Sequence, residues 1–440
     1  MDLLDMDIAK LAKLLSSGEI TSEKLTETYI ENIEKSKVNY YETICKKQAL
    51  AQAQRIDRQR KEGKQLGPLA GIPMAVADNI TTKDILTTAG SKMLSSYIPP
   101  YNATVIERLS KEGAVLLGKL KIEEFNLEDS DVEAKAVSEK QAAYTLGTNI
   151  GGKATSIRPS YGTVSRYGLI GASSSFEQIG VTGKNIRDLT IVLNTITGFD
   201  RRDSTSLPRE KEDYLGFLSQ EPGKFKLFVA NDFFKESIND KDKEKLSAIL
   251  ADLENIGAQV ERVDLETIKY LHPAYKILAS AEFASNAGRY DGIRFGYRAK
   301  DYEDREELYK NTRTEAFGHK AKLAILFGNY VVNGSNYKKY YEKAQRVRRL
   351  IKDQVQELLA DNNLLLIPQL KGQDEIESSY RLLAKMAGLP VINLPCKKDS
   401  LEGFKLQLLG PAFREEQLIQ VGYALEKNID KGSKELNIND

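Results

Sequence analysis

The sequence predicts an α/β protein in which helices flank a largely parallel central sheet, and two observations support this class. From about residue 72 onward, short apolar segments alternate with amphipathic segments of helical period. Glycines such as Gly113 and Gly257 stand where the amphipathic segments end. This strand–helix alternation implies right-handed crossovers between parallel strands. No linker rich in Pro, Gly or Ser interrupts the 440 residues, so we expect a single domain over residues 1–440.

Residues 1–65 are expected to form a helical N-terminal part. Ile8, Leu11 and Leu15 recur at helical spacing, and Gly18 ends this run. Thr21 or Ser22 provides the cap of a second helix, and a third helix is expected over residues 48–60. Later strands are expected at 72–77, 114–117, 225–230, 258–263, 364–367 and 391–394, and later helices at 330–359 and 415–427.

The composition excludes several classes of protein. Lys and Arg number 64 and Asp and Glu 63, so the net charge of +1 gives no bulk attraction to nucleic acid. Two cysteines and two histidines cannot build a disulfide framework, a cysteine-based zinc cluster or a histidine-rich metal site. No run nears the roughly 20 apolar residues of a membrane span, and the start lacks the order of charges of a signal peptide. We therefore expect a cytoplasmic protein that uses no metal and no cofactor.

Four segments combine glycine or proline turns with short apolar strands. Adjacent glycines such as Gly151 and Gly152 let backbone N–H groups approach an anion or an oxyanion, although a Gly-Gly pair alone is usually a turn. The segments are 67–79, 146–153, 158–170 and 386–396.

Together and in this order, the four segments resemble the amidase-signature family, and they are most similar to the A subunit of glutamyl-tRNA(Gln)/aspartyl-tRNA(Asn) amidotransferase. The resemblance covers nearly the whole chain. It implies an amidase-signature fold with a mixed central sheet flanked by helices. It also implies amidotransferase B- and C-type subunits as partners, with only indirect contact with tRNA. Further stretches that support it are 88–92, 118–119, 203–206, 289–297 and 343–348.

The family cleaves amides with a lysine, a bridging cis-serine and a nucleophilic serine, and the resemblance assigns a position to each. The lysine stands directly before Asp-Asn in the family, and this position holds Ala77 here. The cis-serine belongs to a Gly-Gly-Ser-Ser-Gly-Gly loop, but no glycine occurs between Gly118 and Gly147. A charged segment, residues 126–145, replaces this loop and is expected to be a solvated, helical connection.

The nucleophilic serine follows Gly-Gly in the family, and Lys153 follows Gly-Gly here. An alternative stays open, because Ser156-Ile157-Arg158 matches the family's Ser-Ile-Arg under a different gap placement. Ser156 would then be the nucleophile and Lys153, three residues away, a substitute base. The competing interpretation makes Ser156 a turn residue on the surface.

The positions that hold glutamine in the family are also changed. The resemblance places an Arg pair on Leu323-Ala324 and an Asp on Ser378, whereas Tyr297 keeps a pocket tyrosine. The predicted remnant of the ligand pocket is therefore Gly151, Gly152 and Tyr297. A pocket without charged partners should not hold a zwitterion, because desolvating each charge costs several kcal/mol.

These changes favour a non-catalytic relative, a pseudoenzyme that acts by binding partner subunits or a ligand. The alternative is an active amidase or glutamine amidotransferase subunit with the displaced nucleophile Ser156, and a third interpretation is a decaying paralogue without a role. The active alternative requires Lys153, Ser156 and oxyanion donors to converge in one pocket. The non-catalytic interpretation predicts a collapsed or apolar cleft there.

Overall fold

A single eleven-stranded sheet runs through the computed structural model of the chain, in the order β1-β3-β2-β4-β6-β5-β10-β11-β9-β7-β8. The structure describes residues 2–149, 151–235, 238–369, 374–396 and 403–435, without the side chains of 374–378 and 429–435. The predicted class, a mixed sheet flanked by helices, is confirmed. The strands are Tyr41–Ile44 (β1), Pro73–Ala77 (β2), Val115–Leu120 (β3), Tyr144–Gly147 (β4), Thr155–Arg158 (β5), Gly180–Gly183 (β6), Phe225–Ala230 (β7), Ala258–Val263 (β8), Leu364–Gln369 (β9), Val391–Pro395 (β10) and Lys405–Leu409 (β11).

The prediction of a largely parallel sheet was wrong. Four of the pairings between described strands are parallel, namely β2–β3, β2–β4, β7–β8 and β7–β9, and six are antiparallel. Five of the antiparallel pairs lie in the centre, between β4 and β9 in the sheet order, and the sixth, β1–β3, lies at one edge. In the centre, β4, β5 and β6 follow one another along the chain without an α-helix between them. A parallel connection needs a crossover of a dozen or more residues, usually a helix, so the alternation seen at both ends of the sheet does not extend through its middle.

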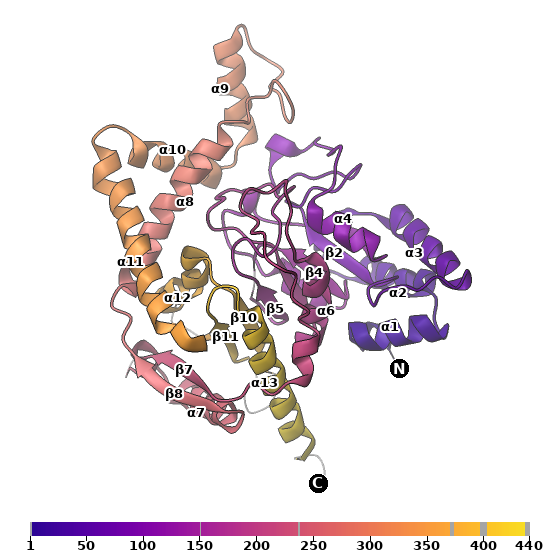
Figure 1. Cartoon of the computed structure of the whole chain (residues 1–440). Coiled ribbons are helices and arrows are strands. Elements are labelled where there is room, and N and C mark those ends of the chain that lie inside the picture. The colour runs from indigo at the N-terminus through magenta and orange to yellow at the C-terminus, as the bar shows by residue number, and fades with distance from the viewer. Residues whose placement is uncertain (1, 150, 236–237, 370–373, 397–402, 436–440) are drawn as a thin grey trace.

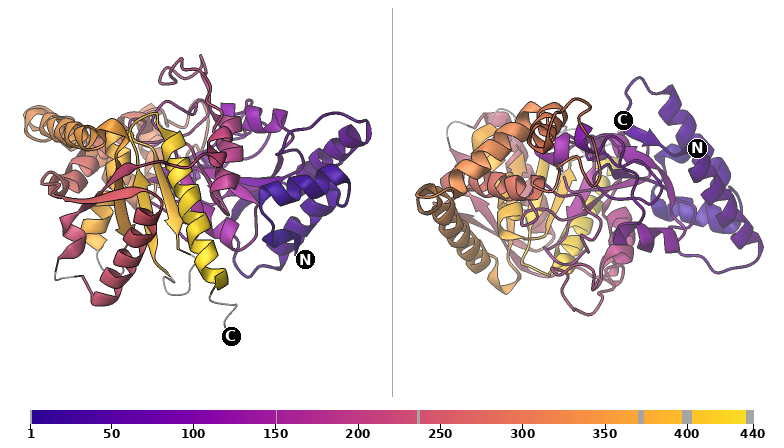
Figure 2. Two further views of the ribbon diagram at one scale, coloured as in Figure 1. Left: turned by 60° about the horizontal axis from the view of Figure 1, so that its bottom comes forward. Right: turned by 90° about the horizontal axis from the view of Figure 1, so that it is seen from above.

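Helices cover both faces of this sheet, as Figures 1 and 2 show. α6 and α13 pack on one face, against β6 and β10, whereas α5 and α12 pack on the other face, against β4 and β9. α8, α10 and α11 pack beside α12 as an outer layer. The α-helices are Ile8–Ser17 (α1), Ser22–Lys35 (α2), Lys46–Lys61 (α3), Thr104–Lys111 (α4), Val132–Ser138 (α5), Ile186–Ile196 (α6), Asp240–Asn255 (α7), Leu271–Ala287 (α8), Arg305–Ala316 (α9), His319–Val332 (α10), Glu342–Leu358 (α11), Asp374–Ala387 (α12) and Glu415–Glu435 (α13).

The three N-terminal helices form as predicted and lie beside the β2 end of the sheet (Figure 1). Gly18 ends α1 with a φ of 76°, a left-handed conformation that favours glycine. Thr21 caps α2, because its side chain accepts a hydrogen bond from the Lys24 N–H at 3.1 Å. The sequence did not predict β1, which lies between α2 and α3 at the edge of the sheet.

The single long helix predicted over 330–359 is two helices. α10 ends at Val332, a π-helical turn covers Tyr337–Tyr341, and α11 begins at Glu342. Gly328 explains the position of α10: a Cβ there would lie 2.1 Å from the carbonyl oxygen of Ser280, so α10 can approach α8 closely only with glycine at this point.

The described helices include none with both the length and the apolarity that a bilayer crossing requires.

Candidate functional site

Ala77 ends β2, at the place where the resemblance requires a lysine. Every residue of this strand is buried, and the exposed fraction of Ala77 is 0%. Val76 pairs with Leu146 of β4 in a parallel register. The next residues, Ala77 and Gly147, are therefore neighbours at the ends of the two strands. The methyl group of Ala77 cannot transfer a proton.

The helix α5, formed within the segment 126–145, packs directly on these strand ends. A Cβ built on Gly147 would lie 2.0 Å from Oε1 of Glu133, and one built on Gly152 would lie 2.6 Å from Cβ of Ala134. Ala134 also forms a small apolar cluster with Val137 and Ala154. The expected helix therefore exists, but its residues 132–134, 136 and 137 are buried. The expectation of a solvated connection was wrong because α5 covers the end of the sheet.

Glu133 places a buried carboxyl group beside Ala77 and Gly147. Its side chain is 2% exposed, and neither carboxyl oxygen has a hydrogen-bond partner among the described residues. The pKa of Glu133 is raised to about 8, chiefly by burial and in smaller part by the nearby Asp129 and Asp131. The space that a catalytic lysine would enter is thus bordered by a largely neutral carboxylic acid.

Lys153 and Ser156 lie in different environments. Lys153 is exposed, whereas Ser156 is fully buried on β5, paired with Thr182 and Asn393. The hydroxyl oxygen of Ser156 accepts a hydrogen bond from the Gly151 N–H at 3.3 Å. This N–H therefore points at Ser156 itself. Ser156 is a strand residue, and the interpretation of it as a surface turn was wrong.

Tyr297 has a separate set of contacts from Gly151 and Gly152. Its hydroxyl donates a hydrogen bond to Glu315, and Nζ of Lys92 lies 4.2 Å from the centre of its ring. Neither of these contacts involves Gly151 or Gly152, so the three residues of the predicted pocket are not brought together by them. Ser378 belongs to α12, and its side chain lies outside the described residues.

Sequence analysis used residues 118–119 only for the resemblance and gave Lys119, which is buried beside β2, no role at the site. Lys119 lies on β3 opposite Val76 and is fully buried. Its ammonium group donates hydrogen bonds to the carbonyl oxygen of Ile80 and to Thr87 Oγ1, and lies 4.0 Å from Asp78 Oδ1. Burial lowers the pKa of Lys119 to about 8. Only the β2–β3 pairing brings this lysine near Asp78, so no local pattern could identify it.

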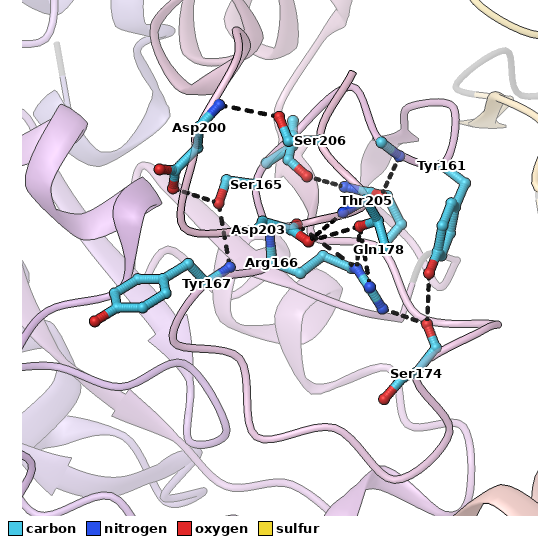
Figure 3. Close-up of polar contacts among 12 residues, drawn as sticks. Tyr161, Ser165, Arg166, Tyr167, Ser174, Gln178, Asp200, Asp203, Thr205 and Ser206 are labelled. Carbon is cyan, nitrogen blue, oxygen red and sulfur yellow. Dashed lines mark hydrogen bonds and ion pairs between the residues drawn. The ribbon is translucent and has the colours of Figure 1, made fainter. Parts of the chain in front are cut away.

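The segment 158–170 is held by a polar network around one loop (Figure 3). The carboxylate of Asp203 accepts hydrogen bonds from the Arg166 N–H at 2.7 Å and from Thr205 Oγ1 at 2.7 Å. Ser165 donates to Asp200 at 2.7 Å, and the Tyr161 hydroxyl donates to the carbonyl oxygen of Ser174 at 3.1 Å. These partners fix the turn, so its hydroxyl groups have structural roles.

Residues of α8, α10 and α12 line a cavity of about 540 Å³. Leu323 and Ala324, where the resemblance places an Arg pair, contribute to its wall. Asp129, Glu177 and Arg381 also line it. Neither Lys153 nor Ser156 lines this cavity.

Comparison with known proteins places the chain among amidases. The family model described as "Amidase" matches residues 24–152 and 130–419. The A subunit of the glutamyl-tRNA(Gln) amidotransferase of Caldanaerobacter subterraneus subsp. tengcongensis is 35% identical over 474 residues, with 97% of each chain covered. The A subunit of the Halothermothrix orenii enzyme is also 35% identical, with 99% of each chain covered.

Solved structures with similar folds cover almost the whole chain. The A subunit of the glutamyl-tRNA(Gln) amidotransferase of Thermotoga maritima has a TM-score of 0.73 and 26% identity, with 97% of this chain and 96% of that one covered. The peptide amidase of Stenotrophomonas maltophilia has a TM-score of 0.80 and 24% identity, with 97% of each chain covered. The second similarity concerns the fold alone.

Proposed function

Because this chain belongs to the amidase family, we propose that it is a non-catalytic relative of the glutamyl-tRNA(Gln) amidotransferase A subunit that acts by binding partner subunits. The proposed partners are B- and C-type amidotransferase subunits, and tRNA is contacted only through them. The chain acts as one domain over residues 1–440, in which α5 covers the former active-site end of the sheet.

The apolar side chain of Ala77 is the observation that carries this proposal. The family's chemistry needs a lysine there to take a proton from the bridging serine, and a methyl group offers no substitute. Glu133, with its pKa near 8, is the titratable group that packs closest to Gly147. A neutral carboxylic acid cannot take up a further proton at physiological pH, so it does not replace the lysine as a base.

The name shared by the curated relatives favours a second candidate, an active amidotransferase subunit with Ser156 as nucleophile. At 35% identity and near-complete coverage, such relatives support an amidase or amidotransferase activity more directly than they support its loss. This candidate requires Ser156, which is fully buried, to become accessible to a substrate.

Ammonia release distinguishes the two candidates. The full chain is assayed with glutamine and with asparagine, alone and after mixing with B- and C-type subunits. Ser156→Ala and Lys153→Ala are assayed in parallel, and Lys338→Ala serves as a control for removal of a lysine elsewhere. Our proposal expects background release in every sample. Release that Ser156→Ala abolishes and Lys338→Ala leaves unchanged would establish the active alternative.

A further inference from the structure

One side of α10 carries large apolar side chains that remain exposed to solvent. Leu323, Leu326 and Tyr330 are 59%, 69% and 52% exposed, and Phe327 is 37% exposed. Their spacing of three and four residues places them on one face of the helix. The opposite side of α10 packs against α8. A helix that is apolar on both sides is normally buried on both, so the exposed face indicates a surface that another molecule covers.

The cavity of about 540 Å³ adjoins this face. Leu323 and Phe327 line it, and Leu127 and Leu382 add further apolar side chains to the wall. The lining contains three acidic and three basic side chains, so charge gives no preference for an anion or a cation inside. An apolar anchor therefore suits this cavity best. An anchor side chain of one protein that fills a pocket of the other is typical of the centre of protein interfaces.

The segment that carries the exposed face is basic. Residues 316–341, which include α10 and the π-helical turn after it, contain four lysines and no aspartate or glutamate. The whole chain, by contrast, has 64 basic and 63 acidic residues. The four lysines are Lys320, Lys322, Lys338 and Lys339.

Two of these lysines lie beside the exposed face without an acidic partner. Nζ of Lys339 lies 5.1 Å from the ring centre of Tyr340, and this ring lies 5.8 Å from that of Tyr330 on α10. Lys320 is paired with Glu128, whereas Lys338 and Lys339 form no ion pair within the described part of the chain. The apolar face of α10 therefore has a cationic border at its Tyr330 end.

These features favour an acidic protein segment over other occupants. A second copy of this chain would bring the same positive charge to the contact, and like charges repel. Nucleic acid interfaces are polar and dominated by phosphate contacts, which would leave the leucines of α10 unmatched. A lipid surface could cover the face, but it offers no protruding side chain for the cavity. An amphipathic helix with an acidic polar side matches the apolar face, the cavity and the basic border together.

We propose that the exposed face of α10 and the adjoining cavity bind an amphipathic, acidic helix of another protein. The apolar side of this helix packs on Leu323, Leu326 and Phe327, and one large apolar side chain enters the cavity. Its carboxylates pair with Lys338 and Lys339. The inference rests on the proposed function, since it names the kind of segment through which a partner subunit binds.

Fluorescence anisotropy of the full chain with a labelled helical peptide tests this proposal. The peptide has about 18 residues, five helical turns, with leucines on one face and glutamates on the other. One control peptide carries lysine in place of every glutamate, and another has the same composition in scrambled order. We expect saturable binding of the acidic amphipathic peptide, at least ten-fold tighter than that of either control. Raising the salt from about 50 to about 500 mM should weaken it several-fold.

Variants of exposed residues then locate the binding surface. Leu326→Glu should weaken binding of the acidic peptide at least ten-fold, because it places a like charge on the apolar face. Lys338→Glu combined with Lys339→Glu should weaken it about ten-fold, and Phe327→Ala about three- to ten-fold. Val38→Glu, at an exposed apolar position in the N-terminal part, is the matched control and should change binding less than two-fold.

Equal affinity for the acidic and the lysine peptide would overturn the proposal, as would unchanged binding by Leu326→Glu. Three further measurements assign the face to another occupant and would also overturn it, if Leu326→Glu abolishes the signal. They are self-association of the unmodified chain, binding of labelled tRNA, and binding of phosphatidylglycerol vesicles.

The peptide titration and the reconstitution with B- and C-type subunits fail separately. A chain that forms the complex but binds no acidic peptide would refute this surface and leave the proposed function standing. A chain that binds the peptide through α10 but forms no complex would refute the proposed function and leave the surface standing.

Discussion

The carboxyl group of Glu133 should make the stability of the protein depend on pH. Its pKa rises from 4.5 to about 8 on folding, chiefly through burial. The folded protein therefore holds this proton more tightly than the unfolded chain, and stability falls as pH rises from about 4.5 through 8. We expect Glu133→Gln, which cannot ionise, to raise the free energy of unfolding at about pH 9 by about 2–5 kcal/mol.

Urea unfolding at about pH 6 and pH 9 measures this effect. Glu254→Gln, an exposed glutamate on α7, is the matched control and should behave like the unmodified protein. If Glu133→Gln and the unmodified protein lost equal stability between these two pH values, Glu133 would not be the buried acid described here.

Ala77→Lys places a lysine where the resemblance to the family expects one. We expect no ammonia release from glutamine, because the cis-serine loop and the serine after Gly152 remain absent. We also expect a lower unfolding temperature, since a lysine placed in a fully buried site is desolvated and overpacks the core. An ammonia assay and a thermal melt on the same preparation test both points, and measurable ammonia release by this variant would refute the account of the site.

At the scale of elements, α5 packs closely on the end of the sheet. Gly152 and Gly18 both have left-handed backbones, with φ of 78° and 76°. A Cβ on Gly152 would lie 2.6 Å from Ala134 of α5, whereas one on Gly18 would meet nothing within 4 Å. We expect both alanine variants to carry similar backbone strain, about 1–2 kcal/mol.

Gly152→Ala should lose about 1–3 kcal/mol more than Gly18→Ala, because only the first variant forces α5 away from the sheet. Chemical denaturation of the two variants measures the difference. Equal losses would mean that α5 is not packed on Gly152, and the end of the sheet would then be open to ligands.

For the whole molecule, local patterns predict the elements better than they predict how these elements meet. Gly18 ends the first helix and Thr21 caps the second, and both could be predicted because capping depends on neighbours in sequence. The antiparallel centre of the sheet was not predicted, because β4, β5 and β6 are short and buried strands without an intervening helix. The placements of Lys119 beside Val76 and of Glu133 beside Gly147 depend on long-range pairing, which no single segment encodes.

The same distinction between local patterns and long-range pairing applies to the residues of the candidate site. The position of Ala77 before Asp78 and Asn79 could be found from the sequence alone. The burial of Ser156 could not, because it depends on β6 and β10, which contribute Thr182 and Asn393 on either side of it. The apolar cleft was predicted at Lys153 and Ser156, and neither residue lines the cavity that has Leu323 in its wall.

Reconstitution with B- and C-type amidotransferase subunits tests the central claim most directly. The complex is isolated by size-exclusion chromatography, and its ammonia release from glutamine is compared with that of the same complex built on the Caldanaerobacter relative. We predict a stable complex that contains this chain and releases ammonia only at background. A complex that releases ammonia well above background, and loses this activity with Ser156→Ala, would contradict the claim.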